Sequence, residues 1–375
     1  MQYVARSFQE LEKQGKTSVK EIDSSITRLR NSVGDLSKAV LQKVLGTATA
    51  PIRQALDQAL DSAKAWRSES TRLMGATGED WRRIGAQIDA VSRQTIRLPG
   101  DVVPYLDTVR ELTGSWKDAR DQAEDYSDLS RYLGRASLAE MAPLAATMES
   151  MFGVRGQGKA REFFDATIRG AERLGQSGRT AVQSFERLAP SLGMQTAAGP
   201  RGEKFARSAA AMLPALQKLG LSPQQAEATV AQASGYFSGD LQGLQRQLRS
   251  AGLLGRKDRL QDEYGRLRYT LPELLGMVGE LSRKHAKGLG GGDDLNLKLL
   301  QQNLPGLLAG AAFHGKELQA NINEALAAGE KPGAPSPLAA NRAQQAATPE
   351  LRRMLDSIDL AVAARKTKGE AELGL

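Results

Sequence analysis

Residues 18–44 carry the sequence feature that most restricts how this chain can fold. Seven apolar residues recur there at alternating steps of three and four, the a/d spacing of a coiled coil over three heptads. These residues, called the seam below, are Val19, Ile26, Val33 and Val40 at the a positions and Ile22, Leu29 and Leu36 at the d positions. β-Branched residues at a with mostly leucine at d favour a dimer, and isoleucine at a d position leaves a trimer open. The stretch therefore predicts a long helix that needs a partner helix.

The partner of the seam is either a second chain or a later helix of the same chain. Gly46 and Pro51 interrupt the helix, and proline fits the first turn of a following one. An amphipathic helix is expected to follow, from residue 52 to about residue 73. Because the chain can turn back at Pro51, the seam could pack inside its own chain. The sequence leaves both arrangements open.

The whole chain is expected to be all-α. Its hydrophobic content of 41% is dominated by alanine and leucine, and Val, Ile and Thr are too scattered to form alternating strand patterns. Glycine and proline divide the chain into helices of different lengths. The predicted organisation is a coiled-coil stalk (1–98), connecting helices (99–150), a globular helical module (151–289), a helical hairpin (290–329), a flexible Pro/Ala-rich linker (330–347), and a short terminal helix with a tail (348–375).

Capping signals and apolar spacing predict where several of these helices begin and which faces they bury. Ser137 with Glu140 and Thr270 with Glu273 have the spacing of capping boxes, and Pro223 follows the capping residue Ser222. Apolar residues at helical spacing predict the core. The predicted core residues are Ile84, Ile88, Val91, Phe163, Phe164, Ile168, Leu174, Val182, Phe185, Leu188, Phe205, Met212, Leu213, Leu216, Val230, Phe237, Leu241, Leu244 and Leu248.

The composition argues against an enzyme. Aromatic residues make up 5% of the chain, and it has two histidines and no cysteine, so thiolate chemistry is excluded. No phosphate-binding glycine loop follows a strand pattern. A Glu149-Ser150 pair and a later Gly193-Met194-Gln195 resemble parts of the lytic transglycosylase signature, but they lie too far apart and lack its remaining residues. We expect no catalytic residue, no metal and no cofactor.

Positive charge is concentrated in one window. The chain has a formal net charge of +8, and residues 246–287 hold ten Lys/Arg against five Asp/Glu. The candidate residues for contact with a polyanion or an acidic surface are Arg246, Arg249, Arg256, Lys257, Arg259, Arg266 and Arg268. Phosphate contact, an acidic protein partner and a solvated helical face all have this pattern.

A repeated pattern of short helical segments, each closed by glycine, runs through residues 163–326. It is clearest in Leu-Gly-Leu-Ser-Pro-Gln-Gln-Ala-Glu at 219–227 and continues through 238–244 and 249–254. Together with the preceding coiled coil, this order resembles the tail tape-measure proteins of long-tailed phages and phage-tail-like bacteriocins. The resemblance implies a structural role, in which helical copies associate in the tail lumen and their length sets the length of the tail tube.

The resemblance also implies partners and a location. The expected partners are the chain itself, as a dimer or trimer, and tail tube, assembly chaperone and baseplate proteins. Apart from the resemblance, the basic window leaves nucleic acid open as a partner, and a transient membrane contact also stays open. No export signal is seen in the first residues, so we expect assembly in the host cytoplasm and a final place in the virion. Two alternatives stay open: a basic nucleic-acid-binding or DNA-ejection protein, and a bacterial coiled-coil scaffold.

Overall fold

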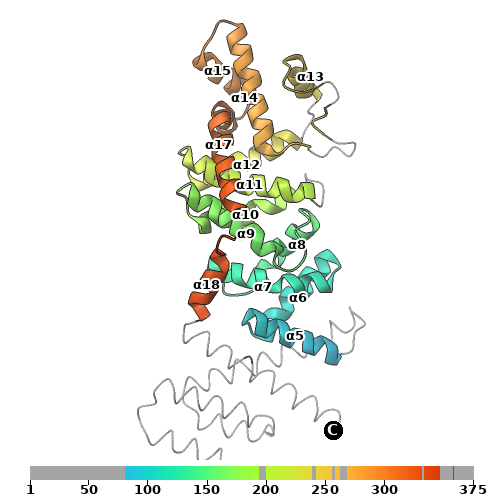
Figure 1. Ribbon diagram of the computed structural model, residues 1–375. Helices are drawn as coiled ribbons and strands as arrows, with labels where there is room; N and C mark the ends of the chain where they lie inside the picture. The colour runs from blue at the N-terminus through green and yellow to red at the C-terminus, as the bar shows by residue number, and fades with distance from the viewer. Residues whose placement is uncertain are drawn as a thin grey trace, which may run out of the picture. The chain divides into compact units, whose positions relative to one another are not determined.

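The computed structural model describes residues 81–193, 200–238, 242–255, 258–261, 268–331, 333–346 and 358. The predicted stalk before residue 81, including the seam, lies outside the described residues. Within them the chain is all-α, with fourteen α-helices and no strand (Figure 1). The predicted fold class is therefore confirmed for the described part of the chain.

The chain divides into two units, each with its own packing. The first unit comprises Met1–Ala142 and Asn341–Leu375, and the second comprises Pro143–Ala340. The helices of the first unit are α5 (Trp81–Thr95), α6 (Pro99–Thr113), α7 (Trp116–Leu133) and the short 3₁₀ helix η2 (Ala139–Met141). The boundaries between the units fall at the start of α8 (Ala142–Ser150) and inside α18 (Pro337–Ala346).

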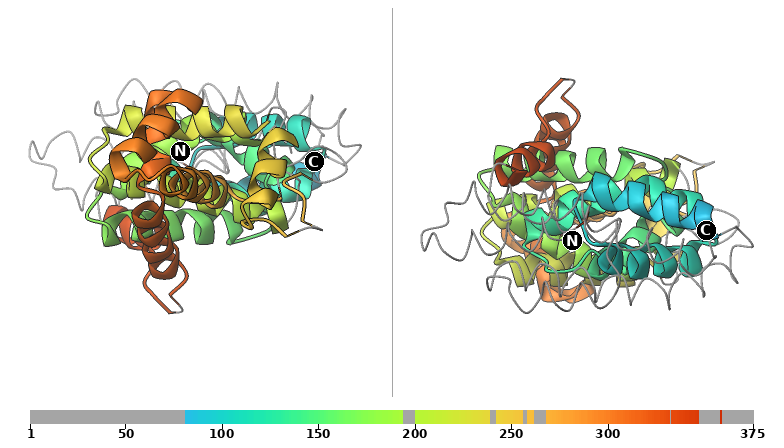
Figure 2. Two further views of the ribbon diagram at one scale, coloured as in Figure 1. Left: turned by 90° about the horizontal axis from the view of Figure 1, so that it is seen from above. Right: turned by 90° about the horizontal axis from the view of Figure 1, so that it is seen from below.

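Three mutually packed helices build the described core of the first unit. α5, α6 and α7 each contact the other two. They are the blue to teal helices in the right-hand view of Figure 2, which is seen from below. Their buried faces hold the predicted Ile84, Ile88 and Val91 together with two fully buried tyrosines, Tyr105 and Tyr126. Glycine C-caps and a serine N-cap mark the ends of these helices. Gly114 and Gly134 end α6 and α7 in the left-handed conformation, and Ser115 Oγ accepts a hydrogen bond from Asp118 N at 3.1 Å to begin α7.

The second unit packs its helices in a different order from their order along the chain. Its remaining helices are α9 (Lys159–Arg173), α10 (Gly178–Gly193), α11 (Pro200–Lys218), α12 (Pro223–Ser238), α13 (Gln242–Ser250), α14 (Leu271–Gly288), α15 (Asp293–Asn303), α16 (Gly306–Phe313) and α17 (Gly315–Gly329). α9 to α12 pack against one another, and α17 returns from far along the chain to contact α9, α11 and α14. The helix that closes this core is therefore one of the last in the chain.

Small residues permit the close approach of α17 to α9. A Cβ added at Gly170 would lie 2.8 Å from the carbonyl oxygen of Ala325, and one added at Gly329 would lie 2.8 Å from that of Ala166. Such a distance is shorter than ordinary van der Waals contact, so only glycine fits at this separation of the two helix axes. Gly279 of α14 approaches the backbone of α16 at Ala312 in the same way.

Most of the predicted core residues are buried. Phe163, Phe164 and Phe185 form a cluster of rings with centroids 5.1–6.4 Å apart. Of the other predicted core positions, Leu244 is only half-buried and Leu241 lies outside the described residues. The spacing of apolar residues thus identified the buried helix faces correctly.

Two of the three capping predictions are confirmed, and the third, at Ser137, is only partly so. Glu140 Oε1 accepts from Ser137 N at 3.2 Å, but Ser137 Oγ accepts from Ala139 N, and Leu138 directly precedes the 3₁₀ helix. Ser222 and Gln225 exchange hydrogen bonds of 2.9 and 3.3 Å at the start of α12, and Pro223 is the first residue of that helix. At the start of α14, Glu273 Oε2 accepts from Thr270 N at 2.7 Å. These signals act within four residues, so they can be read without knowledge of the tertiary structure.

The prediction of a flexible linker over residues 330–347 is wrong for its second half, because α18 is a helix from Pro337 to Ala346. Ala, Leu, Arg and Gln are strong helix formers, and Pro337 fits the first turn. Buried Asp165 of α9 accepts a hydrogen bond from Leu338 N at 3.1 Å and so caps the helix from a distance. Burial raises the pKa of this carboxyl, against the hydrogen bonds from Ser336 and Leu338.

Candidate functional site

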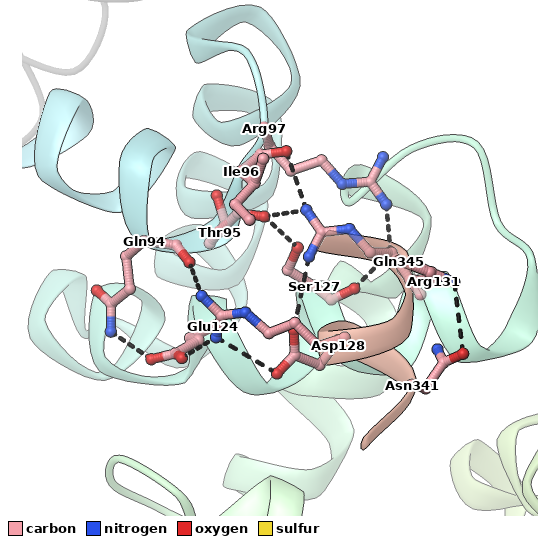
Figure 3. A network of polar contacts seen from close by, with 12 residues as sticks. Gln94, Thr95, Ile96, Arg97, Glu124, Ser127, Asp128, Arg131, Asn341 and Gln345 are labelled. Atoms are coloured by element: carbon pink, nitrogen blue, oxygen red, sulfur yellow. Dashed lines mark hydrogen bonds and ion pairs between the residues drawn. The ribbon is translucent and has the colours of Figure 1, made fainter. Parts of the chain in front are cut away.

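The most elaborate polar cluster in the described residues lies at the C-terminal end of α5 in the first unit (Figure 3). Here the chain turns through Ile96, a non-glycine residue with a φ of 52°, and Arg97 N closes the turn onto Ser92 O at 3.0 Å. A β-branched residue in the left-handed region costs free energy, of the order of 1–2 kcal/mol. The surrounding contacts must therefore hold this turn in place.

Two arginines and a serine satisfy the carbonyl groups that the end of α5 exposes. Arg131 of α7 donates to Thr95 O and, at 2.9 Å, to Ile96 O. Ser127 Oγ donates to Thr95 O at 3.0 Å, and Arg342 Nη2 donates to Gln94 O at 2.7 Å. Cations at a helix C-terminus also interact favourably with the helix dipole. The cluster is thus a C-cap for α5 supplied by two distant parts of the chain.

Two carboxylates balance these arginines. Asp128 is 1% exposed and lies 3.5 Å from Arg131 Nη1 and 3.7 Å from Arg342 Nη1. Arg342 also pairs with Glu124, one turn before Asp128 on α7. Burial, with a smaller effect of the neighbouring Arg97, lowers the pKa of Arg131 from its ordinary value to about 10, against the opposing effect of Asp128. Arg131 remains cationic at neutral pH, so the cluster is a buried ion-pair network.

Arg342 and Ile358 join the first unit from far along the chain. Ile358 is fully buried against Ile96, and Leu98 packs against the same pair. Sequence reasoning missed Arg342 and Ile358 as members of this cluster. Their contacts join residues more than 200 positions apart, and a single arginine in an alanine-rich segment gives no local signal of such a partner.

The structure brings several residues of the predicted basic window together in the second unit. Arg246 of α13 is exposed, as are Arg259 and Arg268. Arg249 is half-buried and donates to Asp258 O. The other candidates, Arg256, Lys257 and Arg266, lie outside the described residues.

No cluster of three or more metal-ligating side chains occurs among the described residues. The two histidines, His285 and His314, lie far apart in the sequence. His314 Nδ1 lies 3.5 Å from Glu317 Oε2, and the side chains of His314 and Glu317 are largely exposed. Glu149, of the Glu149-Ser150 pair that resembles part of the transglycosylase signature, is 1% exposed and lies at the end of α8. No described helix is long and apolar enough to cross a membrane.

The cavity between α9, α11 and α17 is small. Its volume is about 20 Å³, and its lining includes Phe163, Gly170 and Arg207. Such a space holds roughly one water molecule. Arg207 is held there by an ion pair with Glu203 at 2.8 Å and lies over the ring of Phe163. The cavity is therefore a feature of helix packing around a paired arginine.

Comparisons of the chain with protein-family models, with curated proteins and with solved structures found no match.

Proposed function

We propose that this chain is a structural protein of a phage-type tail, related in role to tape-measure proteins, which self-associates through the seam. The observation that carries the proposal is the heptad pattern of residues 18–44, followed by a glycine-punctuated helical module. The apolar residues of a heptad seam become buried when identical helices associate. A continuous helix has a length proportional to its number of residues.

Polar contacts join the helices of the second unit to one another. Glu227 of α12 pairs with Arg187 of α10 and accepts from Ser184 Oγ at 2.6 Å. Glu324 of α17 accepts from Arg173 of α9 at 2.9 Å and from Lys218 of α11 at 3.2 Å. Each of these carboxylates links residues far apart along the chain, and so supports the arrangement of the helices.

The folded part of the chain restricts where a length-setting segment can lie. Within each of the two units the described helices pack against one another, and in the second unit α17 returns to α9, α11 and α14. Helices that fold back on one another add far less length than 1.5 Å per residue. The proposed ruler is therefore the stretch before α5. Helices laid end to end, with breaks at Gly46 and Pro51, would span at most about 120 Å over 80 residues.

Self-association is tested by the molar mass of the full chain in solution. We expect wild-type chain to scatter light with two or three times the 40.3 kDa of a single chain. Asparagine at both Ile26 and Leu29 places polar groups at one a and one d position, where they cannot be buried without cost, and should return the chain to the single-chain mass.

The matched control puts asparagine at Thr27 and Leu41, which occupy b positions of the same heptad pattern and face away from the seam. This control should keep the wild-type mass. If the Ile26/Leu29 variant also keeps the wild-type mass while circular dichroism shows unchanged helix content, the seam packs inside its own chain and the proposal of self-association fails.

A further inference from the structure

Hydrogen bonds gather a set of exposed cations onto one face of the second unit, at α13 and the C-terminal half of α14. Leu260 N donates to Gln245 Oε1 at 2.9 Å, which brings Arg259 next to the α13 turn that carries Arg246. Arg268 N donates to Leu260 O at 2.9 Å and so adds a third arginine beside the other two. The three arginines, Arg246, Arg259 and Arg268, lie up to 22 positions apart in the sequence.

A lysine of α14 extends the same face. Lys284 is exposed, and its Nζ donates to Ala251 O at 2.9 Å, just past the end of α13. Lys287 follows one turn later and is also exposed. Arg249 contributes a guanidinium that is held by Asp258 O. The face therefore combines cations from α13, from the loop after it and from α14.

Two of the three acids described in this window are paired with cations. The third, Asp258, is exposed and directly precedes Arg259, and its Oδ2 accepts from Gly255 N at 3.1 Å. Glu273 accepts from Thr270 N and pairs with Lys204 of α11 at 3.4 Å. Glu280 pairs with Arg283 at 2.7 Å. By contrast, Arg246, Arg259 and Arg268 form no ion pair with any residue in the described ranges, and these three cations outnumber the one carboxylate beside them, Asp258.

We propose that this face, called the α13/α14 cationic face, binds the phosphate backbone of a nucleic acid. Arginine presents a planar fork of donors that suits phosphate oxygens, and several cations on one face can neutralise successive phosphates. An acidic protein partner is the less suitable occupant, because the core of a protein interface is depleted of charged residues and enriched in large apolar ones. Among the described residues from 246 to 289, Leu289 is the one exposed large apolar side chain.

A phosphate-binding face is independent of the proposed structural role, because it uses none of the residues of the seam. The test is a fluorescence anisotropy titration of the full chain with a labelled 30-base-pair DNA duplex at several salt concentrations. Binding should weaken as salt rises, since each neutralised phosphate releases counterions. Alanine at Arg246, Arg259 and Arg268 should raise Kd by about tenfold or more, and should make the slope of log K against log salt less steep by about 2 to 3.

The matched control removes the same number of charges from elsewhere in the second unit, with alanine at Arg201, Lys298 and Lys331. All three are exposed and form no ion pair with a described residue. Kd of this control should stay within about twofold of wild type. A third variant with lysine at 246, 259 and 268 keeps the charge and should keep the salt slope.

Four outcomes would overturn the proposal. They are an absence of binding at low salt, binding that does not respond to salt, an equal loss of affinity in the control variant, and displacement of the duplex by polyglutamate at an equal concentration of charges. The last outcome would assign the face to acidic proteins. Circular dichroism of each variant checks that the helix content is retained.

Discussion

Alanine at Gly279 should destabilise the second unit by about 1–3 kcal/mol, although alanine is the better helix former. A Cβ at this position would overlap the carbonyl oxygen of Ala312 on α16, and a backbone atom cannot rotate out of the way. The two helices must then move apart, which opens gaps in a packed core. The expected net change already includes a gain of up to about 1 kcal/mol from helix propensity.

Gly276 offers a control on the same helix, one turn before Gly279. A Cβ there would meet no atom within 4 Å. Alanine at Gly276 should therefore leave stability unchanged or raise it by up to about 1 kcal/mol. Differential scanning calorimetry and hydrogen exchange of the α14 and α16 amides measure both variants. Equal shifts in Tm for the two variants would contradict the close packing of α14 against α16.

Methionine at Arg131 should destabilise the first unit by about 2–4 kcal/mol. The change keeps much of the apolar stem but removes the hydrogen bonds to Thr95 O and Ile96 O. It also removes one of the two arginines beside Asp128, which is 1% exposed. Removing one partner of a buried ion pair costs more free energy than the intact pair contributes, because the remaining charge stays buried with less compensation.

Tryptophan fluorescence during urea unfolding reports this change selectively. The three tryptophans of the chain are Trp66, Trp81 and Trp116, and all belong to the first unit. Methionine at Arg120, which is 34% exposed on the same helix and pairs with its neighbour Asp121, is the control. It should change stability by less than about 0.5 kcal/mol. Equal unfolding midpoints for the two variants would show that the cluster at the end of α5 contributes little to stability.

The features predicted correctly from the sequence are those that depend on neighbouring residues. Helical spacing identified buried residues such as Ile88 and Phe185, and the capping signals at Ser222 and Thr270 begin helices as expected. These signals act within one or two helical turns, so they survive without knowledge of the tertiary fold.

The features that were missed depend on distant partners. The end of α5 carries Ile96 in a conformation that usually selects glycine, and it is held by Arg131 and Arg342 from elsewhere in the chain. α18 was predicted as a linker, yet its N-terminus is capped by Asp165 from 173 residues away. Likewise, the composition located the basic window, but only the tertiary contacts distinguish Arg283, which is paired, from Arg246, which has no described partner.

The proposed ruler is tested most directly by the length of tails assembled with altered chains, measured by electron microscopy. Residues 19–39 span 21 positions, or three heptads, so repeating them keeps the register of the seam. One and two extra copies should lengthen the tail by about 32 and 63 Å, at 1.5 Å per helical residue. A flexible 21-residue insert at Gly333, between α17 and α18, should leave the length unchanged. Tails of unchanged length in the repeat series, or an equal change with the flexible insert, would contradict the proposal.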